Sequence, residues 1–279
     1  MLKKVVTNHS EAFLAQYRIP PLSFVARGPM PETLLPIWEA LNIGNPALAQ
    51  ARATHALEEK RLFSTNERAA LKTALAAAEL YIGSAEDAKR RAGRALDLFP
   101  HQWMAHRILL TILSTHRDYM AAYMHLSNLD LAGVLPVWDE PMEPIEIELA
   151  LASWSWLLGE WENVVMHLNR AYPGGLATMP QPLQEDWFKL SLYRGRPEDA
   201  AAAAAILIAD RTVELADELL QTIVQNGWTK QALPLYRSAY DRAPKSQLLR
   251  RRLVALCIRE GALDEARELT TPGALSLAA

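Results

Sequence analysis

Four histidines lie close together in the sequence, and they are the first residues to weigh as metal ligands because imidazole binds zinc and other transition metals. They are His101, His106, His116 and His125. No two have the i, i+4 spacing that places a metal-binding pair on one helix face, and the motif HExxH is absent. We therefore expect structural histidines, with no metal site and no cofactor.

Four glutamates form a second candidate for chemistry, since paired carboxylates can act as a general acid and a general base. Glu140, Glu143, Glu146 and Glu148 flank Pro144, where we expect a helix to begin. Acidic side chains stabilise the positive end of a helix dipole. This role accounts for the cluster without catalysis.

Nucleophile motifs are absent as well. The single cysteine, Cys257, excludes an internal disulfide, and its place on the inward side of a predicted helix favours a buried apolar role. We find no phosphate-binding glycine loop, GxSxG, CxxC or deaminase motif. We predict no catalytic residue and no enzyme. The weakest alternative is an enzyme or maturation factor with a site between His101 and Glu148.

The charge balance excludes further classes of function. The net charge of −3 and the pI near 6.2 argue against a nucleic-acid binder. Basic runs at 89–94 and 250–252 are expected on solvated faces, the alternative being a site for an acidic partner. The segment MLKKVVTNHSEAF lacks the apolar region of a signal peptide, and no stretch approaches the ~20 apolar residues of a membrane span. We expect a soluble cytoplasmic protein with no membrane partner.

A recurring turn residue predicts the helices that carry these side chains. It is glycine at six places and arginine once, namely Gly44, Gly83, Arg117, Gly159, Gly195, Gly227 and Gly261. Glycine adopts the positive φ that ends a helix without a Cβ penalty. A period near 34 residues indicates one helix–turn–helix unit that is stacked repeatedly.

Small, aromatic and proline residues follow the turn at fixed offsets. After Gly227 they are Ala232, Tyr236, Ala239 and Pro244, and the unit around Gly83 repeats them with alanine for tyrosine. This pattern resembles the tetratricopeptide repeat family over roughly residues 30 to 270. The resemblance implies an all-α, right-handed α-solenoid of about seven hairpins (30–272) without a sheet, followed by a tail (273–279). Pro234 departs from the pattern because it lies inside a predicted helix.

Residues 1–29 lie outside the repeat frame. The prolines of IPPLSF favour extended structure. One interpretation is an N-terminal cap on the first hairpin, and the other is an arm that docks on another chain or on the groove. Two longer loops, within AGVLPVWDEPMEP and YPGGLATMPQP, also interrupt the period.

In tetratricopeptide arrays the first helices line a concave groove, ten, six and two residues before the turn. Carried over to this chain, the resemblance implies these partner-binding residues: Trp38, Tyr81, Arg107, Thr111, Glu185, Lys189, Tyr193, Asp217, Gln221, Arg251 and Arg259. Trp156 lies one residue away from such a position and is included in the set. The alternative is that the charged members are only solvated and that Trp38 and Tyr193 pack between repeats.

The leading hypothesis is a scaffold that binds a segment of another protein in this groove. The alternative from another class is a regulatory sensor or subunit that binds a small molecule or short peptide inside the superhelix. Tetratricopeptide cochaperones hold the C-terminal carboxylate of chaperones with lysine and asparagine. The matching positions of this chain carry threonine, alanine, arginine and serine, so a chaperone tail is not expected as a partner. A homodimer is compatible with the sequence.

Overall fold

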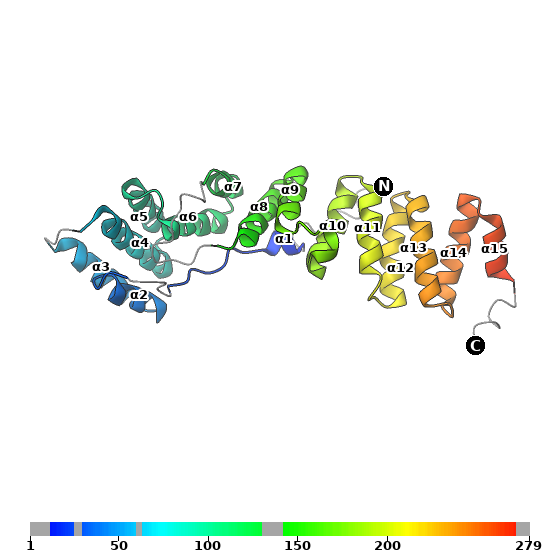
Figure 1. Cartoon of the computed structure of the whole chain (residues 1–279), viewed down its shortest axis with the longest axis horizontal. Coiled ribbons are helices and arrows are strands. Elements are labelled where there is room, and N and C mark those ends of the chain that lie inside the picture. The colour runs from blue at the N-terminus through cyan, green and yellow to red at the C-terminus, as the bar shows by residue number, and fades with distance from the viewer. Residues whose placement is uncertain (1–11, 25–29, 60–62, 130–141, 272–279) are drawn as a thin grey trace. The chain divides into compact units, whose positions relative to one another are not determined.

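The structure is a computed structural model that describes residues 12–24, 30–59, 63–129 and 142–271 (Figure 1). Over these residues the chain forms fifteen α-helices, one short 3₁₀ helix and no strand. The helices are α1 (Phe13–Gln16), α2 (Leu35–Asn42), α3 (Pro46–Glu58), α4 (Thr65–Ile82), α5 (Ala85–Leu98), α6 (Trp103–Thr115), α7 (Tyr119–Ser127), α8 (Pro144–Leu158), α9 (Trp161–Ala171), α10 (Gln181–Tyr193), α11 (Pro197–Leu207), α12 (Val213–Gln225), α13 (Thr229–Arg242), α14 (Gln247–Glu260) and α15 (Leu263–Thr270).

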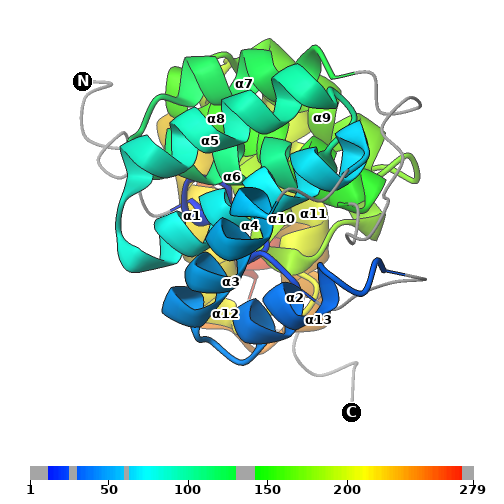
Figure 2. The same cartoon turned by 90° about the vertical axis from the view of Figure 1, so that its left-hand side faces the viewer.

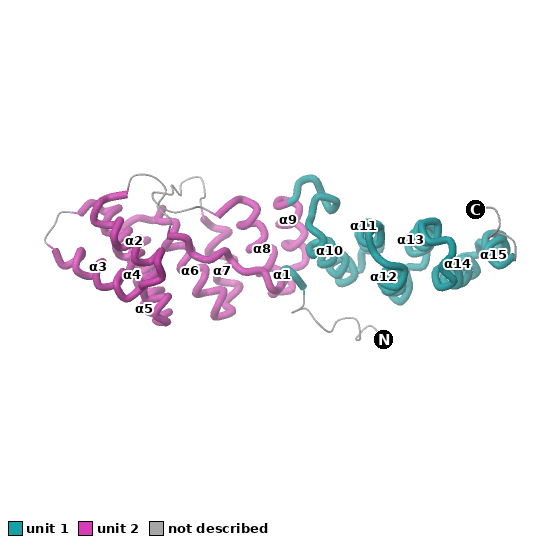
Figure 3. Tube along the Cα trace, turned by 90° about the horizontal axis from the view of Figure 1, so that it is seen from below, with its two compact units in different colours: residues 1–14, 172–279 teal, residues 15–171 magenta. Residues whose placement is uncertain are grey.

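The chain forms two compact units, coloured separately in Figure 3. Unit 1 comprises Met1–Leu14 and Tyr172–Ala279, and unit 2 comprises Ala15–Ala171. Unit 2 contains the hairpins α2–α3, α4–α5, α6–α7 and α8–α9, and unit 1 contains α10–α11, α12–α13 and α14–α15. The predicted all-α fold of seven helical hairpins is confirmed, with four hairpins in unit 2 and three in unit 1. In the end view of Figure 2, α4 and α6 lie nearer the middle of the view than α5 and α7.

Each predicted turn residue ends the first helix of a hairpin with a positive φ. The six glycines have φ between 62° and 97°, and Arg117 adopts the same conformation at 61°. The N–H of Gly83 bonds to Leu80 O, and the N–H of Ser84 bonds to Glu79 O. These two bonds form the Schellman motif, which satisfies the last carbonyls of the helix. The glycine spacing therefore identified the hairpin turns correctly, including the one without glycine.

The residues at the repeated offsets, most of them small, are buried where the paired helices pack together. Ala88, Ala92 and Ala95 are completely buried on α5, and Ala232 and Tyr236 are completely buried on α13. A short side chain lets two helix backbones approach closely, and the larger apolar residues of the first helices fill the space around them. Cys257 is buried in the same way, as expected.

Helix starts are satisfied by local capping groups. Ser64 and Glu67 form a reciprocal capping box on α4, and Glu143 and Glu146 do so on α8. The second pair confirms that these acidic residues stabilise a helix start, while Glu140 lies outside the described residues. Helix α13 continues through Pro234.

Loops between hairpins are described in part. The loop rich in glycine and proline after α9 includes the 3₁₀ helix Leu176–Thr178. Most of the other long loop, 130–141, lies outside the described residues, as does the tail from 272 onward. No described helix is long and apolar enough to cross a membrane.

Candidate functional site

The predicted binding residues lie on the first helix of each hairpin. We call the positions ten, six and two residues before the turn residue the first-helix surface. In unit 2 it is carried by α2, α4, α6 and α8, and in unit 1 by α10, α12 and α14. Each unit is described by itself.

In unit 2 an extended segment of the chain lies against this surface. We call residues 17–24 the arm; they follow α1 and contain neither helix nor strand. In Figure 1 the dark blue trace after α1 runs past α8 and α6 toward α2, so that the arm crosses several hairpins. Residues 17–24 lie against the first-helix surface of their own unit, as the contacts with Arg107, Trp38 and Tyr81 show.

Arg107 of α6 binds the middle of the arm. Its side chain is 3% exposed, and its Nη2 donates to the carbonyl oxygens of Pro20 at 2.9 Å and Pro21 at 2.8 Å. Proline carries no N–H, so consecutive prolines offer only carbonyl acceptors, and a guanidinium offers only donors. The contact thus recognises an extended backbone rather than a particular side chain.

Phe24 anchors the end of the arm through two predicted binding residues. Its ring centroid lies 6.4 Å from that of Trp38 and 5.8 Å from that of Tyr81, and both pairs meet edge to face. Such pairs contribute about 0.5–1.5 kcal/mol beyond the area they bury. Phe24 is 6% exposed and Trp38 only 1%, whereas Tyr81 remains 53% exposed.

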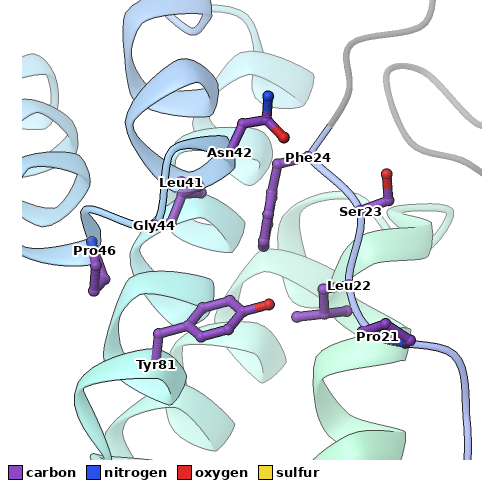
Figure 4. Close-up of a pocket in the computed structure, with 9 residues that line it drawn as sticks. All are labelled: Pro21, Leu22, Ser23, Phe24, Leu41, Asn42, Gly44, Pro46 and Tyr81. Carbon is purple, nitrogen blue, oxygen red and sulfur yellow. The ribbon is translucent and has the colours of Figure 1, made fainter.

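The arm covers this part of the surface without filling it. An open pocket of about 520 Å³ lies beside Leu22 and Phe24 of the arm, and Leu41, Asn42 and Tyr81 form part of its other wall. Figure 4 shows the rings of Phe24 and Tyr81 bordering this space. The pocket is open to solvent, so the arm leaves part of this surface accessible.

The start of the arm packs over α6 and α8. The Tyr17 hydroxyl donates to the carbonyl oxygen of Glu146 at 3.4 Å. Tyr17 and Ile19 also pack against an apolar cluster that includes Trp103 and Ile147. The arm is therefore held at two places by hydrogen bonds from side chains to backbone carbonyls, and by apolar contacts along its length.

Two further predicted residues of unit 2 interact within their own hairpins. The Thr111 hydroxyl donates to the carbonyl oxygen of Arg107 at 2.8 Å, one turn earlier in α6. Trp156 is 2% exposed, and its ring meets that of Trp161 edge to face at 5.4 Å. Their proposed roles in binding stay predictions.

In unit 1 the same surface carries a network of polar side chains. The Tyr236 hydroxyl donates to Asp217 Oδ1 at 2.7 Å and accepts from Gln221 Nε2 at 2.6 Å, while Arg252 Nε lies 3.3 Å from Asp217 Oδ1. Burial, aided by Asp217, raises the pKa of Tyr236, so the hydroxyl stays a donor at neutral pH. The network holds Asp217 and Gln221 in fixed positions.

Helix α10 adds charged residues to this surface. Glu185 pairs with Arg211 at 2.5 Å, and Lys189 Nζ lies 3.4 Å from Oδ1 of Asp186. Asp186 is buried, and its other oxygen accepts the Leu14 N–H at 2.7 Å. Burial raises the pKa of Asp186, although the N–H groups of α1 and Lys189 oppose the rise.

Much of the first-helix surface of unit 1 is open. Lys189, Tyr193 and Gln221 are half-buried, and Arg251 and Arg259 on α14 are exposed. Burial, followed by the charge of Asp186, raises the pKa of Tyr193, so this phenol is neutral. Both acidic members, Glu185 and Asp217, are already paired with arginines. The accessible side chains are therefore mostly cationic, amide or phenolic, and Glu185, which is also accessible, has its charge paired with Arg211.

The structure brings two of the four histidines together. His106 Nδ1 lies 3.0 Å from His125 Nε2, and His106 Nε2 lies 2.8 Å from the carbonyl oxygen of Pro100. Because the carbonyl can only accept, we assign the His106 proton to Nε2 and the bridging proton to His125. Burial lowers the pKa of both rings, which favours this neutral pair.

Sequence reasoning missed a second buried histidine. His167 Nδ1 lies 2.6 Å from Glu148 Oε2, and its Nε2 lies 3.1 Å from the Tyr123 hydroxyl. The pairs His106–His125 and Glu148–His167 occupy equivalent places, eleven residues before and eight after their turn residues. The repeat frame could have found both pairs. Among the described residues no group of three or more histidine, cysteine or acidic side chains could hold a metal ion.

Comparison with a known family agrees with the hairpin pattern. A family model described as a tetratricopeptide repeat matches residues 224–276. Among solved structures, the chain is similar to a thermophilic TPR protein of Thermus thermophilus, with 18% identity over 81% of this chain and 97% of that chain and a TM-score of 0.26. No curated protein matches the chain.

Proposed function

We propose that the chain is a non-catalytic interaction scaffold that binds a segment of a partner protein along its first-helix surface, and the tetratricopeptide repeat model that matches residues 224–276 supports this proposal. The observation that supports this most strongly is the arm in unit 2. There the first-helix surface already holds an extended peptide segment, with Arg107 on its carbonyls and an aromatic pair on Phe24.

The open surface of unit 1 supports a partner segment of a particular charge. Its acidic members are paired with arginines of the same unit, whereas Arg251 and Arg259 are exposed. Electrostatic complementarity then favours an acidic or amide-rich segment. Tyr193 and Arg251 offer the phenol and guanidinium groups that concentrate binding energy in protein interfaces.

Partner capture from cell extract tests this proposal. We expect the charge reversals Lys189→Glu, Arg251→Glu and Arg259→Glu together to remove the partners that the wild-type chain retains. The matched control carries three reversals on or next to second helices, at Arg196, Lys230 and Arg267, and it should retain them. Circular dichroism must show equal helicity for both variants. Equal capture by both variants would contradict binding along this surface.

The sensor hypothesis has one observation in its favour, the open pocket of about 520 Å³ beside Phe24 and Tyr81. Pockets of roughly 300–1,000 Å³ commonly hold small molecules. A metabolite that raises the melting temperature of the wild-type chain, and not of a Tyr81→Ala variant, would favour it.

A further inference from the structure

The arm shows what kind of segment the first-helix surface of unit 2 accepts. We propose that this surface is a second binding site, for an extended proline-containing segment of a partner protein, and that the arm fills it as an internal competitor. The proposal rests on the proposed function, because it assigns a partner chemistry to one part of the same surface.

The contact at Arg107 recognises carbonyl oxygens of the arm. Pro20 and Pro21 present carbonyl oxygens to one buried guanidinium nitrogen. Consecutive prolines preorganise an extended backbone and carry no N–H that needs a partner. Any segment with two adjacent prolines can offer the same acceptors at a low entropic cost, whatever its other side chains are.

The apolar anchor of the arm lies at a fixed distance along the chain from the two prolines. Phe24 follows Pro21 by three residues, and its ring is held between Trp38 and Tyr81. A partner segment therefore needs an aromatic or large aliphatic residue three positions after its second proline. An anchor in an aromatic pocket, combined with backbone recognition, is a recurring mode of binding extended peptides.

The arm leaves part of the surface beside its anchor uncovered. The pocket of about 520 Å³ remains open beside Leu22 and Phe24. Tyr81 is 53% exposed at its rim, and Asn42 is also exposed there (Figure 4). A partner segment with a larger side chain at this place gains contacts that the arm does not make, and this gain allows it to displace the arm.

The covalent link sets the strength of the competition. A tethered segment acts at an effective concentration on the order of 1 mM. If the free segment binds with a dissociation constant on the order of 0.1 mM, the tethered arm weakens the apparent affinity of a competing segment roughly tenfold. Release of the arm should therefore raise the apparent affinity for a competing segment roughly tenfold.

A peptide-binding experiment on the full chain tests the proposal. The probe is a fluorescein-labelled peptide with the sequence of residues 15–24, AQYRIPPLSF, followed by fluorescence anisotropy. The arm-release variant Tyr17→Ala/Phe24→Ala should bind it roughly tenfold more tightly than the wild-type chain does. Adding Arg107→Met to that variant, or replacing both prolines of the peptide with alanine, should weaken binding again by roughly tenfold or more.

Every outcome of this experiment decides the proposal. A folded arm-release variant that binds the probe no better than wild type overturns it. If the variant loses helicity, recovery of helicity on addition of the peptide supports the proposal, and no recovery makes the arm a fixed part of the core. A wild-type dimer in sedimentation that the arm-release variant lacks would assign the site to a second copy and overturn the partner assignment.

The result is independent of the test of the proposed function. Lys189, Arg251 and Arg259 lie in unit 1, so charge reversal there should leave binding of the probe unchanged. Loss of partner capture by those reversals, without tighter probe binding after arm release, would retain the scaffold and remove only this second site.

Discussion

Units 2 and 1 are built from the same hairpin, yet their first-helix surfaces are in different states. In unit 2 the arm lies on the surface, and Trp38 and Arg107 are buried beneath it. In unit 1 the equivalent positions hold Lys189 and Arg251, which are half-buried and exposed, and Asp217 is held by Tyr236. One repeat frame therefore supports both an occupied apolar surface and an open polar one.

The position of a residue within the repeat does not by itself determine whether the residue is buried. Six residues before the turn, a tryptophan in α2 is 1% exposed, whereas a lysine in α10 is half-buried. The geometry of the hairpin places both side chains on the same stripe of a first helix. What covers that stripe depends on a segment outside the repeats.

The largest expected effect comes from truncating this position in each unit. Trp38→Ala should lower the free energy of unfolding of unit 2 by about 3–5 kcal/mol, because it leaves a cavity and removes the contact with Phe24. Lys189→Ala should cost unit 1 less, about 1 kcal/mol, because the half-buried lysine loses only its ion pair with Asp186. Hydrogen exchange of the amides in α4 and α12 reports the two units separately. Similar costs at both positions would show that the surfaces are equally buried.

Removal of one hydroxyl tests the polar network of unit 1. Tyr236→Phe should cost about 1–2 kcal/mol, since it leaves Asp217 and Gln221 without their shared partner. Tyr240→Phe on the same helix is the matched control and should be nearly neutral. Chemical denaturation followed by circular dichroism measures both changes. An unchanged unfolding midpoint for Tyr236→Phe would mean that the network does not hold the surface.

Substitutions at two turn residues should change the free energy of unfolding in opposite directions. Gly227→Ala in unit 1 should cost about 1 kcal/mol, because its φ of 83° is strained for alanine although no neighbouring atom lies within 4 Å of the added Cβ. Arg117→Gly in unit 2 should stabilise by about 0.5–1 kcal/mol through relief of the same strain at 61°. Denaturation midpoints of the two variants should move in opposite directions.

The smallest expected effect is a pH dependence that separates the units. Burial lowers the pKa of His106 and His125, so unit 2 is fully stable above their unfolded value near 6.5 and loses stability as the pH falls below it. Burial raises the pKa of Asp186, so unit 1 gains stability as the pH falls through that raised value toward 4. Hydrogen exchange of α6 between pH 7 and pH 5, and of α12 from pH 7 down to pH 4, measures the two trends.

A double variant provides the control for this prediction. Replacing His106 and His125 with glutamine should remove the loss of stability in unit 2 and leave unit 1 unaffected. Parallel behaviour of α6 and α12 in the wild-type chain would contradict the assignment of the histidine pair.

Much of the fold could be predicted from local signals. A positive φ at the end of a helix strongly favours glycine, so Gly83 and its equivalents mark the turns by residue type alone. Arg117 was found only because its neighbours kept the period. The buried pairs around His125 and His167 follow from the same frame, since a hairpin brings fixed offsets together.

The sequence alone determined the seven hairpins, their turns and the stripe that each first helix presents, because these depend on backbone geometry that repeats about every 34 residues. The tertiary structure decided which stripes are covered. The prolines of the arm indicated an extended segment. The hydrogen bond from Arg107 to the carbonyl oxygen of Pro21, however, joins residues 86 positions apart that no periodicity relates. Such contacts depend on the complementarity of two surfaces, which exists only once the hairpins are stacked.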